Sequence, residues 1–462
     1  MKIRIHENRI ALIGLSASGK TVFLTSLINH LKDHDPALFP LGKDEKAIIR
    51  RFRELEPDQG WSRFEYERQR SKLMEKQAWP GKTKDRNQYA CEFERSDWRF
   101  SKAKLKSFDM PGERLADAVM LGTDYSGWSE HILRMIESDP DCRESGRAFQ
   151  ELLESPKVEA RELITAYKCF LVKLILQHKP YVSPSTFLVS PDGKVNKARP
   201  AEEMVAAPFF IGKDKEREFV PLPEPYRVKR PDIVEPFAQR YQAYRNEIVL
   251  PLIRGLRSCH AFVVLVDVGM LLAGGVGMYN DNRKMLADLL DVLQPGQSLL
   301  GQILRYPTAL LPHGWRPSRT TRIAVVAPKQ DLVHDKDRDN MESLLRRMIE
   351  NRLRNLDGVE YEFFNCSAIV SAEPVPLADG QRWMKAFPIY DSQTGQKVTG
   401  RDSFTFKVSE LPHEWPNTWR PGDFSFPDVY PPMPHRHDCP PEQVNLNKIL
   451  DFIMGVTHAR QR

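Results

Sequence analysis

The stretch that decides the fold is Gly14-Leu15-Ser16-Ala17-Ser18-Gly19-Lys20-Thr21, which has the form G-x-x-x-x-G-K-T. Residues 9–13 before it read Arg-Ile-Ala-Leu-Ile, a short apolar run that is typical of a buried strand. Residues 22–31 after it carry apolar side chains at helical spacing. Because a phosphate-binding loop joins a strand to a helix in this order, the context favours such a loop over a chance glycine-rich turn.

The residue types in this loop suit the binding of phosphate. Gly14 and Gly19 let the backbone bend so that successive N–H groups point toward phosphate oxygens. The helix that follows adds the positive end of its dipole. Lys20 supplies a positive charge to the β- and γ-phosphates, and the hydroxyl of Thr21 is a ligand for Mg²⁺. The predicted nucleotide contacts in this loop are Ser16, Ala17, Ser18, Gly19, Lys20, Thr21 and Val22.

The composition indicates a folded chain of two or three domains. The chain has 462 residues, of which 41% are hydrophobic, and this is enough for a sizeable core. Its 35 prolines indicate long connections outside that core. The net charge of +6 arises from 68 basic and 62 acidic residues, so it does not demand a nucleic-acid partner.

Cysteine usage and hydropathy predict a cytoplasmic protein. The six cysteines are scattered without a C-x-x-C pair, which is typical of thiols in a reducing compartment. Charged residues such as Lys2, Arg4 and Glu7 interrupt the first stretch, so no secretory apolar segment opens the chain. We find no run of 18 apolar residues that would span a membrane.

Short apolar strands alternate with helices, which predicts an α/β fold with a mostly parallel sheet covered by helices on both faces. Residues 178–235 lack periodicity and read as an insertion or linker. Strands are expected at 87–94 and 102–108, as an antiparallel pair, and at 261–266, 322–327 and 359–365. Helices are expected around 43–55 and 64–77, and at 128–136, 148–154, 158–176, 241–256, 280–293, 341–356 and 444–458.

This pattern predicts a core with two additions. The additions are a mainly helical insertion at 114–255 and a region of Pro- and Trp-rich loops and short strands at 374–440. The nucleotide-binding core is expected to comprise 1–113, with inserted helices at 32–80, together with 256–373 and 441–462.

A carboxylate and a glycine follow the second strand of the antiparallel pair. Asp109-Met110-Pro111-Gly112 has the form D-x-P-G. Asp109 could hold Mg²⁺ through a water, and the N–H of Gly112 could meet a γ-phosphate oxygen. A plain turn also suits D-x-P-G, but the phosphate loop upstream favours the functional interpretation. Asp267, at the end of a buried strand, is the alternative magnesium aspartate.

Two further residues are candidates for catalysis. Glu113 follows Gly112, where many GTPases carry a glutamine that orients the attacking water. A carboxylate can accept a hydrogen bond from that water but cannot donate one, so a surface role for Glu113 is the alternative. Thr83 lies in a loop before a predicted strand, where a switch threonine could close on Mg²⁺. The alternative is a solvated loop threonine, and Ser62 and Ser71 are weaker candidates.

Pro328-Lys329-Gln330-Asp331 follows a buried strand and resembles the [NT]-K-x-D tetrad that reads guanine. Asp331 would accept hydrogen bonds from guanine N1–H and N2–H₂, a donor pair that adenine lacks, while the stem of Lys329 lies across the ring. Pro328 cannot supply the side-chain hydrogen bonds with which Asn or Thr tethers the loop. A plain K-x-D turn is the alternative.

A short serine–alanine element follows the next strand. Ser367-Ala368 comes one helix and one strand after the tetrad, and its backbone N–H would meet guanine O6. Ser371-Ala372 is the fallback. The cluster at 435–439, His-Arg-His-Asp-Cys, lacks spaced partner ligands and favours a solvated loop over a metal site.

In chain order these motifs form the signature of the translation-factor-like branch of P-loop GTPases. Four stretches resemble the YcjX family of bacterial GTP-binding proteins more narrowly: Ile10–Thr21, Trp79–Thr83, Ser107–Leu115 and Val263–Asp267. The resemblance covers nearly the whole chain. It implies a Ras-like core with added helical material, Mg²⁺-dependent GTP binding and slow hydrolysis. Because the family is associated with stress-induced envelope operons, it also implies a role in stress and a membrane-associated partner at the inner membrane.

The sequence therefore predicts a GTP-binding switch that slowly hydrolyses GTP to GDP and phosphate. The predicted catalytic residues are Lys20, Thr83 and Glu113, and the predicted Mg²⁺ ligands are Thr21, Thr83 and Asp109. The remaining predicted nucleotide contacts are Gly112, Lys329, Asp331, Ser367 and Ala368. The alternatives are an ATP-using P-loop ATPase or kinase, and a non-catalytic scaffold that holds a structural nucleotide.

Overall fold

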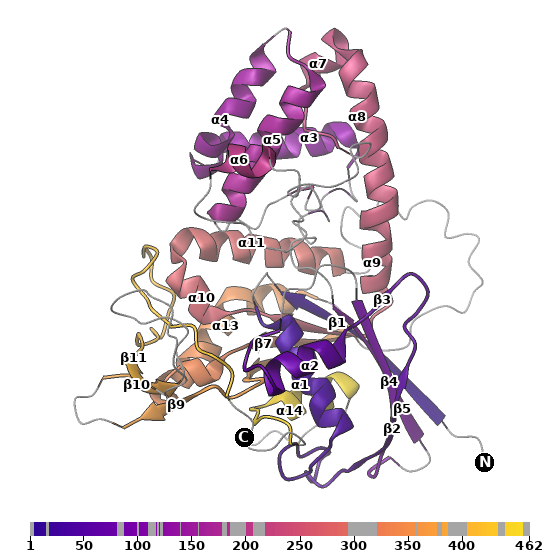
Figure 1. The fold of residues 1–462 in the computed structure, drawn as a ribbon, viewed down its shortest axis with the longest axis vertical. Helices are drawn as coiled ribbons and strands as arrows, with labels where there is room; N and C mark the ends of the chain where they lie inside the picture. The colour runs from indigo at the N-terminus through magenta and orange to yellow at the C-terminus, as the bar shows by residue number, and fades with distance from the viewer. Residues whose placement is uncertain are drawn as a thin grey trace. The chain divides into compact units, whose positions relative to one another are not determined.

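The chain forms two compact units, and each is described by itself. Unit 1 comprises Met1–Gly112, Ser258–Arg283 and Pro317–Arg462, and unit 2 comprises Glu113–Arg257 and Lys284–Arg316. The computed structural model (Figure 1) describes residues 4–14, 18–80, 87–98, 101–109, 117, 120, 123–138, 140–155, 157–177, 183–184, 200–206, 218–293, 321–356, 358–376, 381–386, 404–432 and 439–455.

Unit 1 is built on an eight-stranded sheet with the order β2-β4-β5-β1-β6-β7-β8, in which β3 pairs with β4 beside this path. The strands from β5 to β8 along this order run parallel to one another, and β4 runs antiparallel to both β2 and β5. The predicted α/β class, its mostly parallel sheet and its antiparallel pair are confirmed. The strands are β1 (Arg4–Gly14), β2 (Ile49–Leu55), β3 (Ser62–Arg63), β4 (Asn87–Arg95), β5 (Ser101–Asp109), β6 (Ala261–Leu265), β7 (Thr321–Ala327) and β8 (Val359–Asn365).

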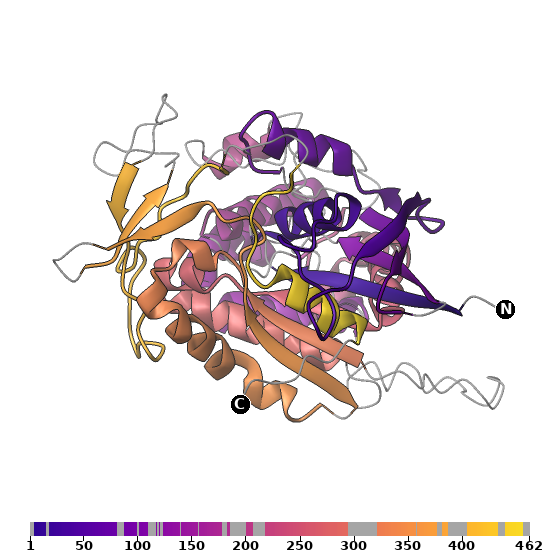
Figure 2. The ribbon, with the colours of Figure 1, turned by 90° about the horizontal axis from the view of Figure 1, so that it is seen from below.

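Helices cover both faces of this sheet, as predicted. Successive residues of a strand point to opposite faces. On β8, Phe363 therefore meets Arg346 of α13 (Arg338–Leu353), while Phe364 meets Phe452 of α14 (Leu446–Met454). The face toward α14 also carries α1 (Lys20–Lys32), whose apolar residues share one core cluster with α14 and the central strands. α14 lies near α1 in both ribbon views (Figures 1 and 2).

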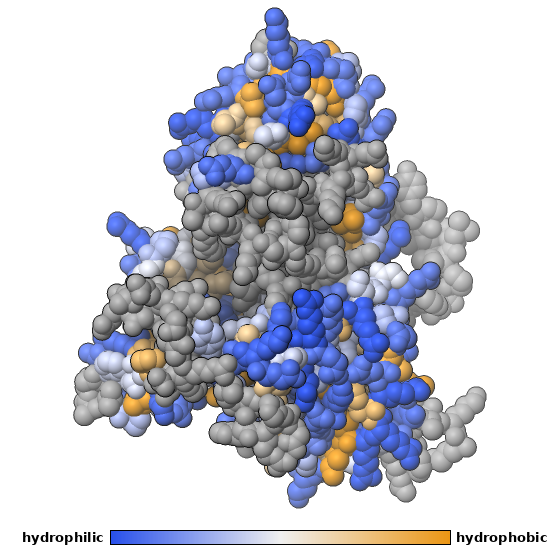
Figure 3. Space-filling view, viewed as in Figure 1, coloured by the Kyte–Doolittle hydropathy of each residue, from blue (hydrophilic) through white to orange (hydrophobic). Residues whose placement is uncertain are grey.

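The helix expected around 43–55 is wrong, because residues 49–55 form the edge strand β2. β2 pairs with β4 across a register shift between Arg50 and Arg53, and Arg51 adopts φ 51° there. Its arginines lie beside acidic residues of β4, with Arg51–Glu94 at 3.3 Å. That partner strand comes later in the chain, so the local charge pattern could not reveal the pairing. The next predicted helix is confirmed as α2 (Tyr66–Met74), over which hydrophilic side chains dominate the visible face (Figure 3).

The remaining described elements of unit 1 lie outside the eight-stranded sheet. α10 (Val268–Ala273) and the start of α11 (Gly275–Leu293) follow β6. Residues 404–432 pack there through aromatic rings, with Tyr279 and Trp415 centroids 4.4 Å apart. The short strands expected at 374–440 are confirmed, although the first begins slightly earlier. They form a second sheet of β9 (Ala372–Val375), β10 (Trp383–Ala386) and β11 (Phe404–Lys407).

Unit 2 is helical where the structure describes it. Its interior is aromatic, with Trp128, Tyr167, Phe219, Tyr241 and Tyr244 all fully buried. The helices are α3 (Tyr125–Ser138), α4 (Pro140–Glu154), α5 (Ala160–Leu176), α6 (Ala201–Ala206), α7 (Glu224–Lys229), α8 (Pro231–Tyr244), the π-helical η4 (Arg245–Val249) and α9 (Leu250–Arg257).

The aperiodic region expected at 178–235 is wrong in part, because α6, α7 and the start of α8 fall within it. Pro231 occupies the first turn of α8, where proline is tolerated because the first N–H groups of a helix have no partner inside it. Proline-rich composition was therefore a misleading sign of a linker. Among the described residues, no helix combines the length and the apolar content that crossing a bilayer requires.

Candidate functional site

The residues singled out by sequence follow the carboxyl ends of neighbouring parallel strands. In the register, Leu12 of β1 pairs with Asp109 of β5, and Gly14 of β1 pairs with Leu265 of β6. Leu265 pairs with Val326 of β7. Val326 in turn pairs with Phe364, near the end of β8. All of the groups singled out therefore lie at the carboxyl ends of the parallel strands, which is where open α/β sheets bind ligands. They are the phosphate loop, Asp109, Asp267, the tetrad at 328–331 and Ser367.

The glycines on either side of the loop after β1 have conformations that suit a phosphate-binding loop. A Cβ at Gly14 would lie 2.5 Å from Ser18 Oγ and 2.7 Å from the carbonyl oxygen of Leu265, so only glycine fits. Gly19, the residue before α1, adopts φ 87°, in the left-handed region that favours glycine. Lys20 Nζ donates to the carbonyl oxygen of Gly14 at 2.7 Å, which places the buried ammonium beside the loop backbone.

An unsatisfied hydroxyl lies in the same loop. The Oγ of Ser18 is buried and, within the described part of the chain, has no hydrogen-bond partner. A buried polar atom without a partner is costly, so such an atom in a native structure requires an explanation. The tight glycine cradle and this hydroxyl fit a phosphate group, which offers several acceptor oxygens.

The predicted magnesium ligands are described only in part. Thr21 is half-buried in the first turn of α1, and its carbonyl oxygen accepts a hydrogen bond from Thr25 at 2.7 Å. Asp109 is fully buried at the end of β5. A threonine hydroxyl and a carboxylate are hard oxygen donors of the kind that Mg²⁺ prefers. Ser16, Ala17, Thr83, Gly112 and Glu113 lie outside the described residues, and so does most of the cluster at 435–439.

The weaker candidates for the switch hydroxyl have other positions. Ser62 lies in the short strand β3. The hydroxyl of Ser71 donates to Glu75 within α2 at 2.6 Å. No group of three or more His, Cys, Asp or Glu residues with metal-site geometry occurs among the residues that the structure describes.

The tetrad after β7 is held by an ion pair that the sequence did not reveal. Lys329 adopts the left-handed conformation with φ 62°, and its Nζ lies 2.8 Å from Oδ2 of Asp267. The Asp267 carboxylate raises the pKa of Lys329, so its ammonium stays charged. Oδ1 of Asp267 also accepts a hydrogen bond from the N–H of Met270 at 2.9 Å and so caps α10. The alternative magnesium aspartate thus already has two protein partners.

Asp331 organises the loop that follows β8. The hydroxyl of Ser367 donates to Oδ1 at 2.7 Å and also accepts from the N–H of Asp331 at 2.9 Å. Ser371 donates twice to Oδ2, from its N–H at 2.8 Å and from its hydroxyl at 2.6 Å. Asp331 is 5% exposed, and these bonds satisfy its buried charge. The structure therefore brings Asp331 and Ser367 together, and it adds Ser371.

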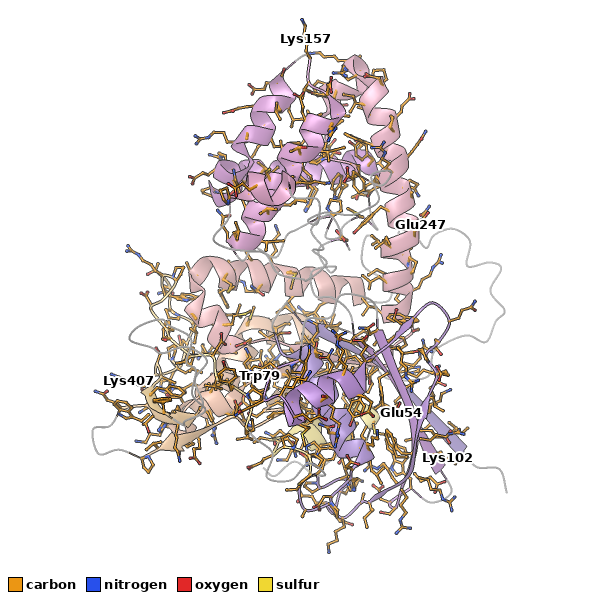
Figure 4. The ribbon with its side chains drawn as sticks, in the orientation of Figure 1. Glu54, Trp79, Lys102, Lys157, Glu247 and Lys407 are labelled. Carbon is orange, nitrogen blue, oxygen red and sulfur yellow. The ribbon has the colours of Figure 1, made fainter. Side chains whose placement is uncertain are left out.

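The element at 367–368 is tied directly to the phosphate-loop helix. The hydroxyl of Ser26 on α1 donates to the carbonyl oxygen of Ala368 at 2.5 Å. The next residue, Ile369, packs in a cluster with Val22 of α1, Trp79 and two α2 residues. Trp79 (labelled in Figure 4) also donates from Nε1 to the carbonyl oxygen of Val429 at 2.6 Å. This apolar cluster thus joins three segments. They are the segment before the predicted switch threonine, the segment after the phosphate loop and the segment after β8.

The comparisons with known proteins agree with this architecture. Residues 8–457 match the sequence model of the YcjX-like family, DUF463. The chain belongs to the YcjX-like family.

Two relatives of this YcjX-like chain cover it almost completely. One is Ras-like GTPase YcjX of Escherichia coli (strain K12), which is 23% identical over 97% of this chain and 95% of the relative. The other is Ras-like GTPase YcjX of Shewanella oneidensis, which is 22% identical over 97% of this chain and 94% of the relative. The family resemblance predicted from the motifs is therefore confirmed, and the α/β fold of unit 1 is consistent with a Ras-like core.

Sequence reasoning missed Ser26 in this YcjX-like site and did not reveal the contacts that Asp267 and Ser371 make there. Ser26 reads as one polar residue in an amphipathic helix, and nothing local marks its contact with Ala368. Asp267 was assigned a possible magnesium role, whereas its position at a strand end just before a helix is also typical of an N-cap. Ser371 was retained only as a substitute for Ser367, although the structure uses both serines at once.

Proposed function

We propose that this protein binds guanine nucleotide together with Mg²⁺, hydrolyses GTP slowly to GDP and phosphate, and acts as a nucleotide-dependent switch. The observation that carries the proposal is that two groups of residues lie at the same end of the sheet, the carboxyl ends of its parallel strands. The phosphate loop follows β1, and the fixed Lys329–Asp331–Ser367 group follows β7 and β8. The names of the two relatives support a GTPase.

In this proposal Asp331 reads the base. A carboxylate offers about four acceptor positions, and guanine presents two donors, N1–H and N2–H₂, where adenine has none. Ser367 uses one position on Oδ1, and Ser371 uses both positions on Oδ2. Guanine would therefore exchange with at least one Ser371 donor when it binds. Base recognition and the order of the loop that carries Ser371 are linked in this way.

Thr21, Thr83 and Asp109 would hold the metal, and Lys20 with the loop N–H groups would hold the phosphates. When bound, Mg²⁺ neutralises charge on the β- and γ-phosphates. Gly112 would meet the γ-phosphate. Glu113 could accept a hydrogen bond from the attacking water but could not donate one, so we expect low intrinsic turnover. Catalysis would rest on position and charge rather than on covalent chemistry.

Base specificity is tested by comparing GDP, ADP and XDP on the wild type and on Asp331→Asn. Xanthine carries a carbonyl oxygen where guanine carries its N2 amine, so an asparagine amide can donate to it. We expect the wild type to bind GDP more tightly than ADP by at least about tenfold, and Asp331→Asn to prefer XDP over GDP. Tighter binding of ADP by the wild type would support the ATPase or kinase alternative instead.

Turnover is tested by single-turnover GTP cleavage on the wild type and on Glu113→Gln. We expect slow cleavage by the wild type and faster cleavage by Glu113→Gln, because glutamine can both accept from the water and donate. Cleavage by the wild type as fast as an activated GTPase would contradict the expectation. Bound nucleotide that never turns over, with no change in proteolysis of residues 60–125 between GDP and a GTP analogue, would favour the scaffold alternative.

We also propose the role in stress and the membrane-associated partner that the family resemblance implies. A switch of this kind would contact such a partner in only one nucleotide state. The measurement is the fraction of protein that sediments with inner-membrane vesicles when it is loaded with GDP or with a non-hydrolysable GTP analogue. Equal recovery in both states would contradict a nucleotide-controlled partner.

A further inference from the structure

The residue before Lys329 lacks the side-chain hydrogen bonds that Asn or Thr supplies in the [NT]-K-x-D tetrad. Lys329 is followed by the short 3-10 helix η6 (Gln330–Leu332), and it is preceded by Pro328, whose side chain can neither donate nor accept a hydrogen bond. Lys329 also adopts φ 62°, which costs energy for a residue with a Cβ. A lysine stem has several rotatable bonds, so some other group must select the orientation in which it could lie against a base.

Asp267 has the position and the geometry to do this. It follows β6, the strand next to β7, and its side chain is 5% exposed. Its Oδ1 is fixed by the 2.9 Å hydrogen bond from Met270 N–H at the start of α10. Because this cap sets the orientation of the carboxylate, Oδ2 is also aimed in one direction, and it lies 2.8 Å from Lys329 Nζ. A helix terminus thereby orients the ion pair.

The side chains of Lys329 and Asp267 differ in how much of each is exposed to solvent. The Lys329 side chain is 39% exposed, whereas the carboxylate that it meets is almost fully buried. Water and salt screen the attraction of a buried carboxylate for a cation less than that of a surface one. Asp428 and Asp331 also act on Lys329 electrostatically, but the pair with Asp267 contributes most to its raised pKa. The ammonium is thus anchored while part of the aliphatic stem stays accessible.

We propose that Asp267 is a positioning residue that holds Lys329 in place for the nucleotide base, the task that Pro328 cannot perform. The inference rests on the proposed guanine-nucleotide site and gives Asp267, which the sequence offered only as an alternative magnesium ligand, a different role in it. Asp267 is not expected to contact the nucleotide or the metal. It acts through Lys329.

The test uses Asp267→Asn, because asparagine caps a helix about as well as aspartate but carries no charge. Lys329→Met removes the other partner, and a double variant combines the two changes. Asp428→Asn is the matched control, since it removes a carboxylate near the same lysine that forms no ion pair with it among the described contacts. Melting temperature is recorded for each variant, and Asp267→Ala shows the separate effect of losing the cap.

Two readouts are needed. The first is acetylation of Lys329 by acetic anhydride, followed by mass spectrometry without nucleotide, which reports on the ion pair alone. The second is the dissociation constant for GDP. We expect Asp267→Asn to raise labelling of Lys329 severalfold and to weaken GDP binding about tenfold, at nearly unchanged melting temperature. The double variant should bind GDP no more weakly than Lys329→Met, and Asp428→Asn should bind it like the wild type.

The outcomes separate this inference from the proposed function. If the wild type binds GDP and Asp267→Asn binds it equally well, the positioning role is overturned while the proposed function stands. Losses that multiply in the double variant would also overturn it, because independent sites are additive in free energy. If the wild type binds no guanine nucleotide, the proposed function fails, and the positioning role fails with it even where the labelling confirms the ion pair.

Discussion

The ion pair between Arg95 and Asp451 joins β4 to α14 in the interior of unit 1. The two side chains have no exposed surface, and Arg95 Nη1 lies 2.6 Å from Oδ1 of Asp451. Oδ2 of Asp451 accepts a hydrogen bond from the N–H of Gly42 at 2.8 Å. Arg95 also pairs with the partly exposed Asp97 at 2.9 Å. Removing Asp451 would leave the buried guanidinium of Arg95 with the partly exposed Asp97, and removing Arg95 would take the guanidinium away from the buried Asp451 carboxylate.

We therefore expect Asp451→Asn to lower the free energy of unfolding of unit 1 by about 3–5 kcal/mol, the range measured when buried pairs are broken. The assay is urea unfolding followed by tryptophan fluorescence, with the slope checked for constancy. Arg95→Met should cost a similar amount, because it leaves Asp451 charged and buried. The double variant Arg95→Met with Asp451→Leu should lose much less than the sum of the two single losses.

A matched pair on α2 provides the control. Arg68 and Glu65 lie at nearly the same distance, 2.7 Å, but their side chains are 67% and 58% exposed. Water and salt screen such a pair, so Arg68→Gln should change the free energy of unfolding by no more than about 1 kcal/mol. If Asp451→Asn and Arg68→Gln cost the same, burial does not set the strength of these pairs and the reasoning is refuted.

Three further predictions concern the loops and the core. Gly14→Ala should abolish nucleotide binding measured by calorimetry, because its Cβ would meet the Leu265 carbonyl oxygen at 2.7 Å; unchanged binding would show that the loop can widen. Ser371→Ala should tighten GDP binding about two- to tenfold, because it frees an acceptor position on Asp331; weaker binding would show that Ser371 orders the site instead. Burial lowers the pKa of His30 to about 4, so the neutral ring contributes stability above its unfolded pKa of about 6.5. That contribution, about 3 kcal/mol, should be lost as the pH falls from about 6.5 toward 4, and urea unfolding of His30→Gln should lack this loss.

The phosphate loop could be predicted because its information is local. Gly14 and Gly19 lie at positions where the backbone needs glycine, one for space and one for its left-handed conformation. The flanking strand and helix are marked by short-range periodicity; the helix formed close to the expected bounds, whereas the strand begins at Arg4, well before the expected Arg9. The same holds for β6 and β7, whose continuous apolar runs are typical of strands buried on both faces.

Local information failed where a distant partner decided the structure. Residues 49–55 carry charges that suit an exposed helix, yet they form a strand because β4 offers a free edge and acidic partners. Residues 201–240 include two helices and most of a third that local periodicity did not mark. Their stability comes in part from burial of aromatic rings such as Phe237 and Tyr241 in the interior of unit 2.

The sequence by itself determined which residue types lie at the carboxyl ends of the strands: a G-x-x-x-x-G-K-T stretch after β1, a carboxylate at the end of β5, and a lysine, an aspartate and a serine after β7 and β8. Parallel strands bring their carboxyl ends to one edge, so chain order alone implied that these groups meet. Only the tertiary structure decided how each group is held. Asp267 meets Lys329, and Ser371 joins Ser367 on Asp331, through contacts between residues far apart in the chain. Such contacts depend on strand register and loop packing, which no local pattern encodes.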